Sequence, residues 1–213
     1  MSVLSLVLLS LLAAICSCDI TMFGQFMISR PIFSGALFGY ILGDMYIGLW
    51  VGMIIEMLWI NELPMGSAIP VDLTMMTLLS VVWTLISFKG VQSAAIFALV
   101  LAIPFSYLYR EVDIAGRLFN TKIMHWVEIG IENGKEHRIT LGIIYGLTLF
   151  MTRAIVCYFV FFIIGNLIYK EIYAFLPIEI LFCLKKAWFY LPICGFGVVL
   201  YNFKSIKFPS IKR

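Results

Sequence analysis

Long apolar runs separated by short polar stretches dominate the pattern of this chain. The runs fall at residues 2–18, 31–60, 69–88, 91–109, 139–168 and 177–203. A straight helix needs about 20 apolar residues to cross a hydrocarbon core of about 30 Å, and most of these runs are close to that length. The pattern predicts an all-α, polytopic integral membrane protein. We find neither an internal repeat nor a linker, so residues 1–213 are expected to form a single domain.

The second run, residues 31–60, is too long for one ordinary span and is interrupted at Gly43-Asp44. Each half has about 13 residues and a length of roughly 20 Å, which is shorter than the hydrocarbon core. We therefore expect broken or re-entrant helices here, because such backbone is tolerated where it is buried in protein or lines a cavity. The alternative is one long, tilted helix that packs through its small residues.

Residues 110–138 are an extended polar region in an otherwise apolar chain. Apolar side chains recur in it at steps of three and four residues, which predicts one amphipathic helix at the membrane interface or packed on the bundle. Asn133-Gly134 is expected to end this helix. Lys and Arg are frequent in this region and in the C-terminal tail, so the positive-inside rule places both on the cytoplasmic side.

Composition indicates that lipid is the solvent. Hydrophobic residues make up 62% of the chain and charged residues 13%, with a mean hydropathy of +1.03, whereas soluble domains are about 25% charged. A net charge of +3 gives no support for nucleic-acid binding. The five cysteines fall in apolar runs without metal-ligand spacing, so we expect buried thiols and neither metal nor cofactor. No catalytic nucleophile is expected, because no such motif is present.

The first apolar run bears on targeting. No Lys or Arg precedes it, whereas a cleaved secretory signal begins with a basic stretch. The segment from Ile15 to Cys18 is only faintly similar to a lipoprotein cleavage site. We therefore expect residues 2–18 to be retained as a membrane helix.

Acidic residues within and beside the apolar runs are the candidate functional groups. Asp44 and Glu56 both lie inside the run 31–60. A charged side chain at the centre of a bilayer costs roughly 2.5–3.5 kcal/mol on insertion scales, so it usually faces a cavity or a partner and marks a functional site. Asp72 follows the break at Pro70. It either caps the next helix or joins a polar pocket formed by unwound backbone.

Arg153 lies midway along the run 139–168. At that place it must pair with an acid or face water. Asp44, Glu56 and Asp72 are candidate partners, and the sequence does not choose among them. Gln25 adds an amide that both donates and accepts hydrogen bonds, as sugar hydroxyls require.

Together these residues resemble the IIC subunit of the mannose/fructose/sorbose family of the bacterial phosphotransferase system. That family has a glutamine or acid ahead of an Arg-Pro pair, glycines four residues apart leading to Gly-Asp, further spaced glycines leading to a glutamate, and a small-residue stretch ending in Pro-x-Asp. The matching residues here are Gln25; Arg30-Pro31; Gly35, Gly39 and Gly43-Asp44; Gly48, Gly52 and Glu56; and Gly66 to Pro70 with Asp72. Weaker similarity extends through the polar region and Arg153 to Gly197.

The resemblance implies a sugar permease component of the bacterial inner membrane that spans the membrane several times. It implies an integral IID partner, a trimer of IIC–IID pairs, and cytoplasmic IIA and IIB phosphocarriers, with IIB phosphorylating the sugar. The chain stops soon after Gly197, so it resembles a IIC subunit shortened at its C-terminus. The alternatives are a degenerate IIC paralogue with a sensing or regulatory role, and an unrelated small substrate-capture subunit.

The residues and the resemblance together give two sets of candidates. The candidate sugar-binding residues are Gln25, Asp44, Glu56, Asn61 and Asp72. The candidate structural residues are Arg30, Pro31, Gly35, Gly39, Gly43, Gly48, Gly52, Gly66, Pro70 and Arg153.

Overall fold

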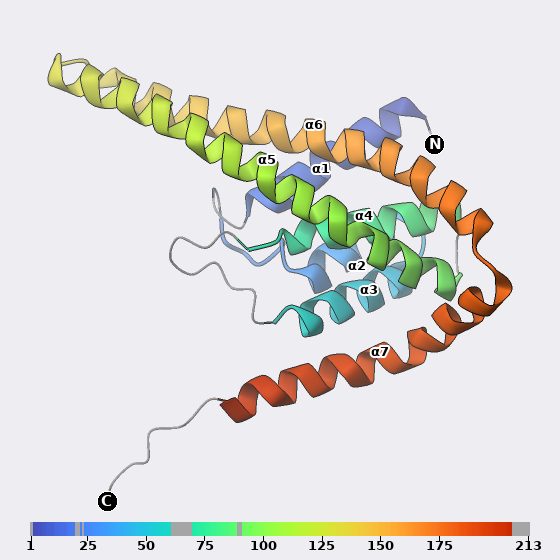
Figure 1. Ribbon diagram of the computed structural model, residues 1–213. Helices are drawn as coiled ribbons and strands as arrows, with labels where there is room; N and C mark the ends of the chain where they lie inside the picture. The colour runs from blue at the N-terminus through green and yellow to red at the C-terminus, as the bar shows by residue number, and fades with distance from the viewer. Residues whose placement is uncertain (1, 20–21, 23, 61–69, 89–90, 206–213) are drawn as a thin grey trace, which may run out of the picture.

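A computed structural model describes residues 2–19, 22, 24–60, 70–88 and 91–205 of the chain (Figure 1). All regular elements in that part of the chain are helices, as the apolar pattern predicts. They are α1 Val3–Cys18, α2 Pro31–Leu42, α3 Met45–Leu58, α4 Leu73–Ser87, α5 Gln92–Glu132, α6 His137–Phe175 and α7 Ile178–Ser205. The predicted all-α fold is confirmed.

The break within residues 31–60 is real and lies where the sequence places it. Helix α2 ends at Gly43, whose φ of 92° is in the left-handed region that favours glycine. Asp44 then caps α3, because its side chain accepts a hydrogen bond of 3.1 Å from the backbone N–H of Ile47. Two short antiparallel helices result, and the alternative of one long helix is wrong.

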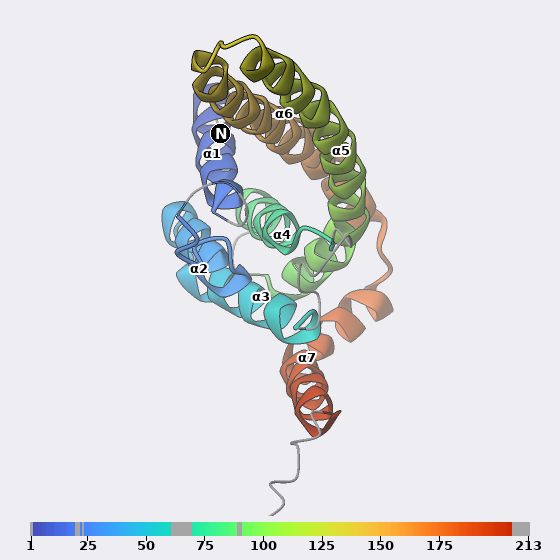
Figure 2. The same cartoon turned by 90° about the vertical axis from the view of Figure 1, so that its left-hand side faces the viewer.

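Spaced glycines let α2 and α3 approach each other closely. A Cβ on Gly48 would lie 2.1 Å from the carbonyl oxygen of Gly35, and a Cβ on Gly52 would lie 2.1 Å from that of Pro31. These distances leave no room for any side chain, so the four-residue spacing serves backbone packing. The hairpin lies against α4 in both ribbon views (Figure 2).

Helix α4 is the centre of the bundle, with α1, the α2–α3 hairpin and α5 around it (Figure 2). All its residues from Thr74 to Leu85 are buried. Its interior hydroxyls bond to the helix's own carbonyls, as Ser80 Oγ does to Met76 O at 2.7 Å. Such bonding lets a buried apolar helix carry Ser and Thr without orphaned polar groups.

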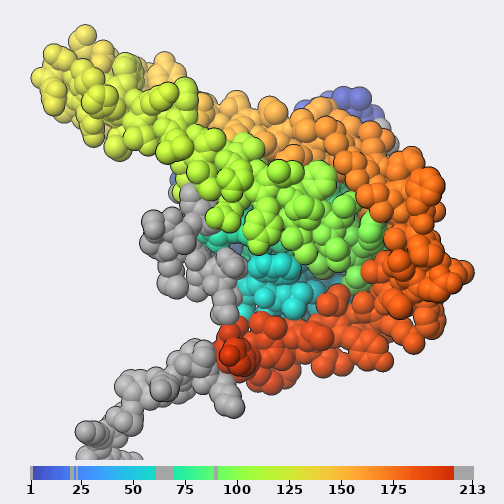
Figure 3. All heavy atoms as spheres, in the orientation of Figure 1, coloured from blue at the N-terminus to red at the C-terminus, as the bar shows by residue number. Residues whose placement is uncertain are grey.

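The outer part of α5 and the first part of α6 extend together beyond the bundle as an arm (Figures 1 and 3). The polar region is therefore the outer half of the 41-residue α5 rather than a separate helix. Its apolar face packs on α6, in agreement with the second of the two expected placements: Trp126 packs edge-on against Tyr145, with ring centroids 6.2 Å apart. Gly134, with φ of 72°, follows the end of α5 as predicted.

Helix α7 returns along the opposite side of the bundle and packs on α3 (Figure 1). Its main anchor is Trp188, which stacks on Trp50 with ring centroids 3.7 Å apart and planes 7° apart. Within the described residues, three helices, α5, α6 and α7, are long and apolar enough to cross a membrane, whereas α1 to α4 are shorter apolar helices. The short length predicted for α2 and α3 is thus shared by α1 and α4, the other two helices in this group.

Candidate functional site

Glu56 lies at the start of α2, although it comes from the last turn of α3. Its Oε2 accepts a hydrogen bond of 3.2 Å from the backbone N–H of Ile32, and its Oε1 is 3.9 Å from Nη1 of Arg30. A helix N-terminus carries unpaired N–H groups and a partial positive charge, which together stabilise a carboxylate. The Glu56 side chain keeps 25% of its surface exposed, so it retains an open edge for a further donor.

The loop that precedes α2 is organised by Asp19. Asp19 Oδ1 accepts a hydrogen bond of 2.7 Å from Phe26 N, and Oδ2 accepts longer bonds of 3.4 Å from the N–H and hydroxyl of Ser29. Gln25 lies on this loop with its side chain exposed and its φ at 52°, a costly conformation for a residue with a Cβ. An aspartate at a segment end is expected to be solvated, but Asp19 is buried and structural.

Asp72 begins the central helix and connects it to this loop. Its Oδ1 accepts a hydrogen bond of 2.8 Å from Met75 N, so the predicted capping role is present. Thr74, two residues later, donates its hydroxyl to the carbonyl of Ser29 at 2.7 Å. Because Ser29 adjoins Arg30, which faces Glu56, a continuous path of polar contacts leads from α3 to the start of α4.

Asp44 does not join this path. It lies at the turn between α2 and α3, whereas Glu56 lies twelve positions further along α3 beside the start of α2. Twelve residues of helix correspond to roughly 18 Å. The predicted carboxylates therefore occupy two ends of one hairpin, and Glu56 and Asp72 share an end.

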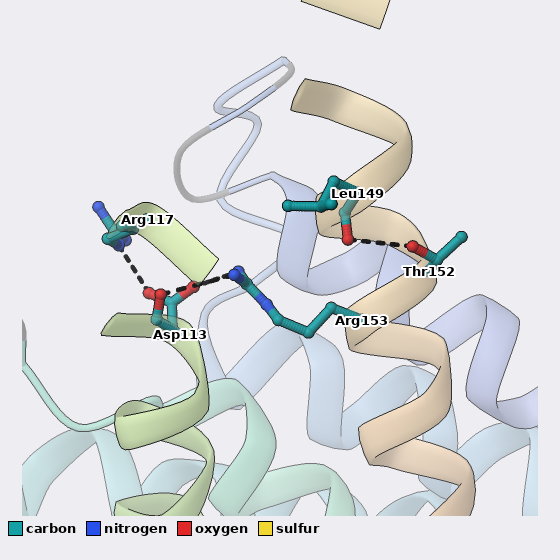
Figure 4. A network of polar contacts seen from close by, with 5 residues as sticks. All are labelled: Asp113, Arg117, Leu149, Thr152 and Arg153. Atoms are coloured by element: carbon teal, nitrogen blue, oxygen red, sulfur yellow. Dashed lines mark hydrogen bonds and ion pairs between the residues drawn. The ribbon is translucent and has the colours of Figure 1, made fainter. Parts of the chain in front are cut away.

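Arg153 pairs with Asp113, which was not among the partners considered from the sequence. Its Nη2 contacts Oδ1 of Asp113, and Arg117 Nε donates to Oδ2 of the same carboxylate at 2.7 Å (Figure 4). Gly116 makes the space, since a Cβ there would overlap Nη1 of Arg153. The spacing of Asp113 and Arg117, four residues apart on a helix, was the available signal for this cluster.

Two buried tyrosines lie one helical turn from the Asp113–Arg153 pair. The rings of Tyr109 on α5 and Tyr158 on α6 have centroids 6.2 Å apart. The hydroxyl of Tyr158 bonds to that of Ser17, near the end of α1, at 2.6 Å. We refer to the polar groups between Glu56 and the Asp113–Arg153 pair as the polar layer, and the bonded pair of Ser17 and Tyr158 borders it. Its members are Asp19, Ser29, Arg30, Glu56, Asp72, Thr74, Tyr109, Asp113 and Arg153.

Of the remaining predicted residues, the two prolines lie close to helix starts. Pro31 begins α2, and Pro70 lies just ahead of the Asp72 cap. Asn61 and Gly66 lie outside the described residues. Within the described ranges, no three His, Cys, Asp or Glu side chains are grouped so that they could hold a metal ion.

Comparison with known proteins decides the family. A family model described as the PTS system sorbose-specific IIC component matches residues 3–207. The chain belongs to this family. Family membership and the three long apolar helices make it a multi-pass protein of the bacterial inner membrane.

Curated relatives of this IIC chain are similar over part of their length. The mannose-specific EIIC components of Escherichia coli K12 and of Shigella flexneri are each 27% identical to it over 110 residues. The aligned part is 52% of this chain and 40% of each relative. The match thus spans less than half of the curated relatives' length.

Solved structures show the same fold. A chain described as a membrane protein has a TM-score of 0.76 at 20% identity, covering 97% of this chain and 82% of its own. A chain from the complex of the mannose transporter ManYZ with a microcin has a TM-score of 0.69, with the same identity and coverage. At this identity the likeness establishes the architecture of the IIC family rather than a substrate.

Proposed function

We propose that this IIC-family chain binds a hexose-like sugar in the polar layer and passes it across the inner membrane for phosphorylation by a separate IIB subunit. The observation that carries the proposal is the continuous polar path from Glu56 through Arg30 and Ser29 to Asp72. It lies at one end of an otherwise apolar bundle. Sugar hydroxyls both donate and accept hydrogen bonds, and this path offers the carboxylates of Glu56 and Asp72 and the guanidinium of Arg30.

The sugar class follows from chemistry and is consistent with the names of the relatives. Carboxylates accept bonds from two hydroxyls each, and uncharged polyols match that geometry without needing a compensating cation. Gln25, Glu56 and Asp72 are the proposed ligands from the sequence-based set. Asn61, which lies outside the described residues, stays a prediction as a ligand. Asp44 as a ligand stays a prediction, placed at the other end of the hairpin.

We further propose that the chain acts with an IID membrane subunit, with IIA and IIB phosphocarriers, and as a trimer of IIC–IID pairs. Many large apolar side chains are exposed on the arm and on α7, including Phe119, Ile143, Phe189 and Ile193. Lipid and a membrane partner together cover such surface in an integral complex.

Sugar uptake by a bacterial host that lacks its own permeases tests this function. The chain is expressed with and without its IID and IIB partners, and radiolabelled mannose, glucose, fructose and sorbose are supplied in turn. We expect uptake of at least one hexose when all subunits are present. A correctly assembled complex that takes up none of them would instead favour the sensing paralogue.

Asp72→Asn and Glu56→Gln are expected to weaken sugar binding by roughly ten- to hundredfold, because a charge-assisted hydrogen bond to a hydroxyl contributes about 1.5–3 kcal/mol. Asparagine caps helices as well as aspartate does, so the start of α4 should persist in Asp72→Asn. Sugar affinity and the amount of assembled complex are measured in the same preparations.

Glu171→Gln is the matched control, because Glu171 is exposed on α6 away from the layer. Asp44→Asn makes the same change as Asp72→Asn in a second helix cap. An equal loss of affinity in Asp44→Asn would place Asp44 in the sugar path, and unchanged affinity in both layer variants would remove Glu56 and Asp72 from it.

The isolated chain is expected to transport no measurable sugar, because the family relationship implies a path completed by IID. Purified chain in liposomes, loaded with labelled mannose on one side, gives the measurement. The same liposomes with the partner subunit added provide the positive comparison. Robust uptake by the chain alone would contradict the composite path.

A further inference from the structure

The hydroxyl of Tyr109 is a buried polar group of the polar layer whose bonding is incomplete in a way that suggests a ligand. Among the described residues of the layer, Arg153 Nε is also buried without a partner. Tyr109 is 2% exposed, and its hydroxyl has no hydrogen-bond partner among the described residues. Buried tyrosine hydroxyls usually find a partner. The neighbouring Tyr158 follows that rule through its bond to Ser17.

The hairpin of α4 and α5 brings Tyr109 level with Asp72. The two helices pack side by side and turn at Phe88 and Val91, whose backbones are joined by a hydrogen bond of 3.3 Å. Counting back from Phe88, Asp72 is sixteen residues away, and counting forward from Val91, Tyr109 is eighteen residues away. These lengths are roughly 24 and 27 Å, so the carboxylate and the phenol lie at nearly the same depth.

The charged surroundings of Tyr109 support the same placement. Asp72, Arg153 and Asp113 are the charged groups close enough to act electrostatically on its hydroxyl. Arg153 pairs with Asp113 through Nη2, whereas its Nε is buried without a partner among the described residues. Asp72 bonds to Met75 N. The phenol therefore stands among charged groups that do not bond to it, with its own donor and acceptor capacity unused.

We propose that Tyr109 is a sugar-contacting residue, whose hydroxyl bonds to a hydroxyl of the hexose held at Asp72. The inference rests on the proposed sugar-binding function and adds to it a ligand from α5, outside the motif region of residues 25–72. In the unliganded state the phenol is unsatisfied, and the bound sugar supplies its partner. Tyr109 thereby links the sugar to α5, the helix that carries Asp113 and one side of the arm.

Tyr109→Phe separates this role from a structural one. Removing an unpartnered buried hydroxyl should leave the melting temperature of the sugar-free complex unchanged or raised. The same variant should lower sugar affinity by about tenfold, the effect of losing one hydrogen bond to a neutral partner. Both quantities are measured on the purified complex with its IID partner, using labelled mannose, glucose, fructose and sorbose as probes.

Tyr158→Phe is the matched control, because it removes the hydroxyl of the adjacent ring, which is bonded to Ser17. It should lower the melting temperature and leave sugar affinity unchanged. Wild-type affinity in Tyr109→Phe, with binding intact in the parent complex, would overturn the inference while leaving the proposed function standing. Absence of sugar binding by the parent complex would overturn both.

Discussion

Gly48→Val is expected to prevent the α2–α3 hairpin from forming and to abolish folding of the chain. The Cβ would lie 2.1 Å from the carbonyl oxygen of Gly35 and 2.8 Å from the Cα of Gly39. Both of these atoms belong to the backbone of α2, which cannot move aside as a side chain can, so the two helices would have to separate. Overpacking costs typically 1–3 kcal/mol and more where backbone must shift, and we expect a loss of about 3 kcal/mol or more.

Gly146→Ala provides the control for this substitution. Gly146 is also a helical glycine, but nothing lies within 4 Å of the position its Cβ would take. Alanine should stabilise α6 by up to about 1 kcal/mol through helix propensity. The yield of monodisperse protein and its melting temperature in detergent give the measurement. A normally folded Gly48→Val protein would show that close approach of α2 and α3 is dispensable.

Arg153→Met is expected to lower the free energy of unfolding by about 3 kcal/mol. The change leaves Asp113 buried without its main partner, and breaking a buried ion pair from one side typically costs 3–5 kcal/mol. We expect the lower end of this range of energies because Arg117 still contacts Asp113 Oδ2. Thermal unfolding of the purified variant measures the effect.

Two further variants decide whether the loss comes from the ion pair. Arg117→Ala should cost less than about 1 kcal/mol, because its side chain is 49% exposed and exposed pairs contribute little. The double variant Asp113→Leu/Arg153→Met should recover much of the stability lost in Arg153→Met, since no uncompensated charge remains. Equal losses in the single and double variants would show that packing of the Arg153 stem, rather than charge, is what matters.

The elements of this fold were largely predictable because its helices are set by local signals. Gly43 ends one helix and Asp44 starts the next, whatever lies around them. The outer half of α5 was harder to predict as part of one long helix. Its polar face resembles that of an interfacial helix, and a proline such as Pro104 often marks the end of a helix. The helix continues through Pro104 because α6 packs along its whole length, which is tertiary information.

The candidate site was only partly predictable for the same reason. Glu56 and Asp72 stand out as acids within or beside apolar runs, and the structure places them at one end of the bundle. Asp19 and Asp113 lie close to polar segments and look solvated in sequence, yet both are buried. Asp19 is held by the loop that follows it, and Asp113 pairs with Arg153 from a helix distant in the chain. Tyr109 carries no sequence signal at all, since its importance lies in a missing partner that becomes visible only when its neighbours are known.

The stacked indoles of Trp50 and Trp188 offer a built-in optical reporter. Rings held 3.7 Å apart and nearly parallel couple their excited states, which gives a paired signal in the circular dichroism of the indole bands. One ring belongs to α3 and the other to α7, so the signal reports whether these two helices are docked. Transport intermediates in which α7 leaves the hairpin would lose it, and they can be followed without attaching any label to the protein.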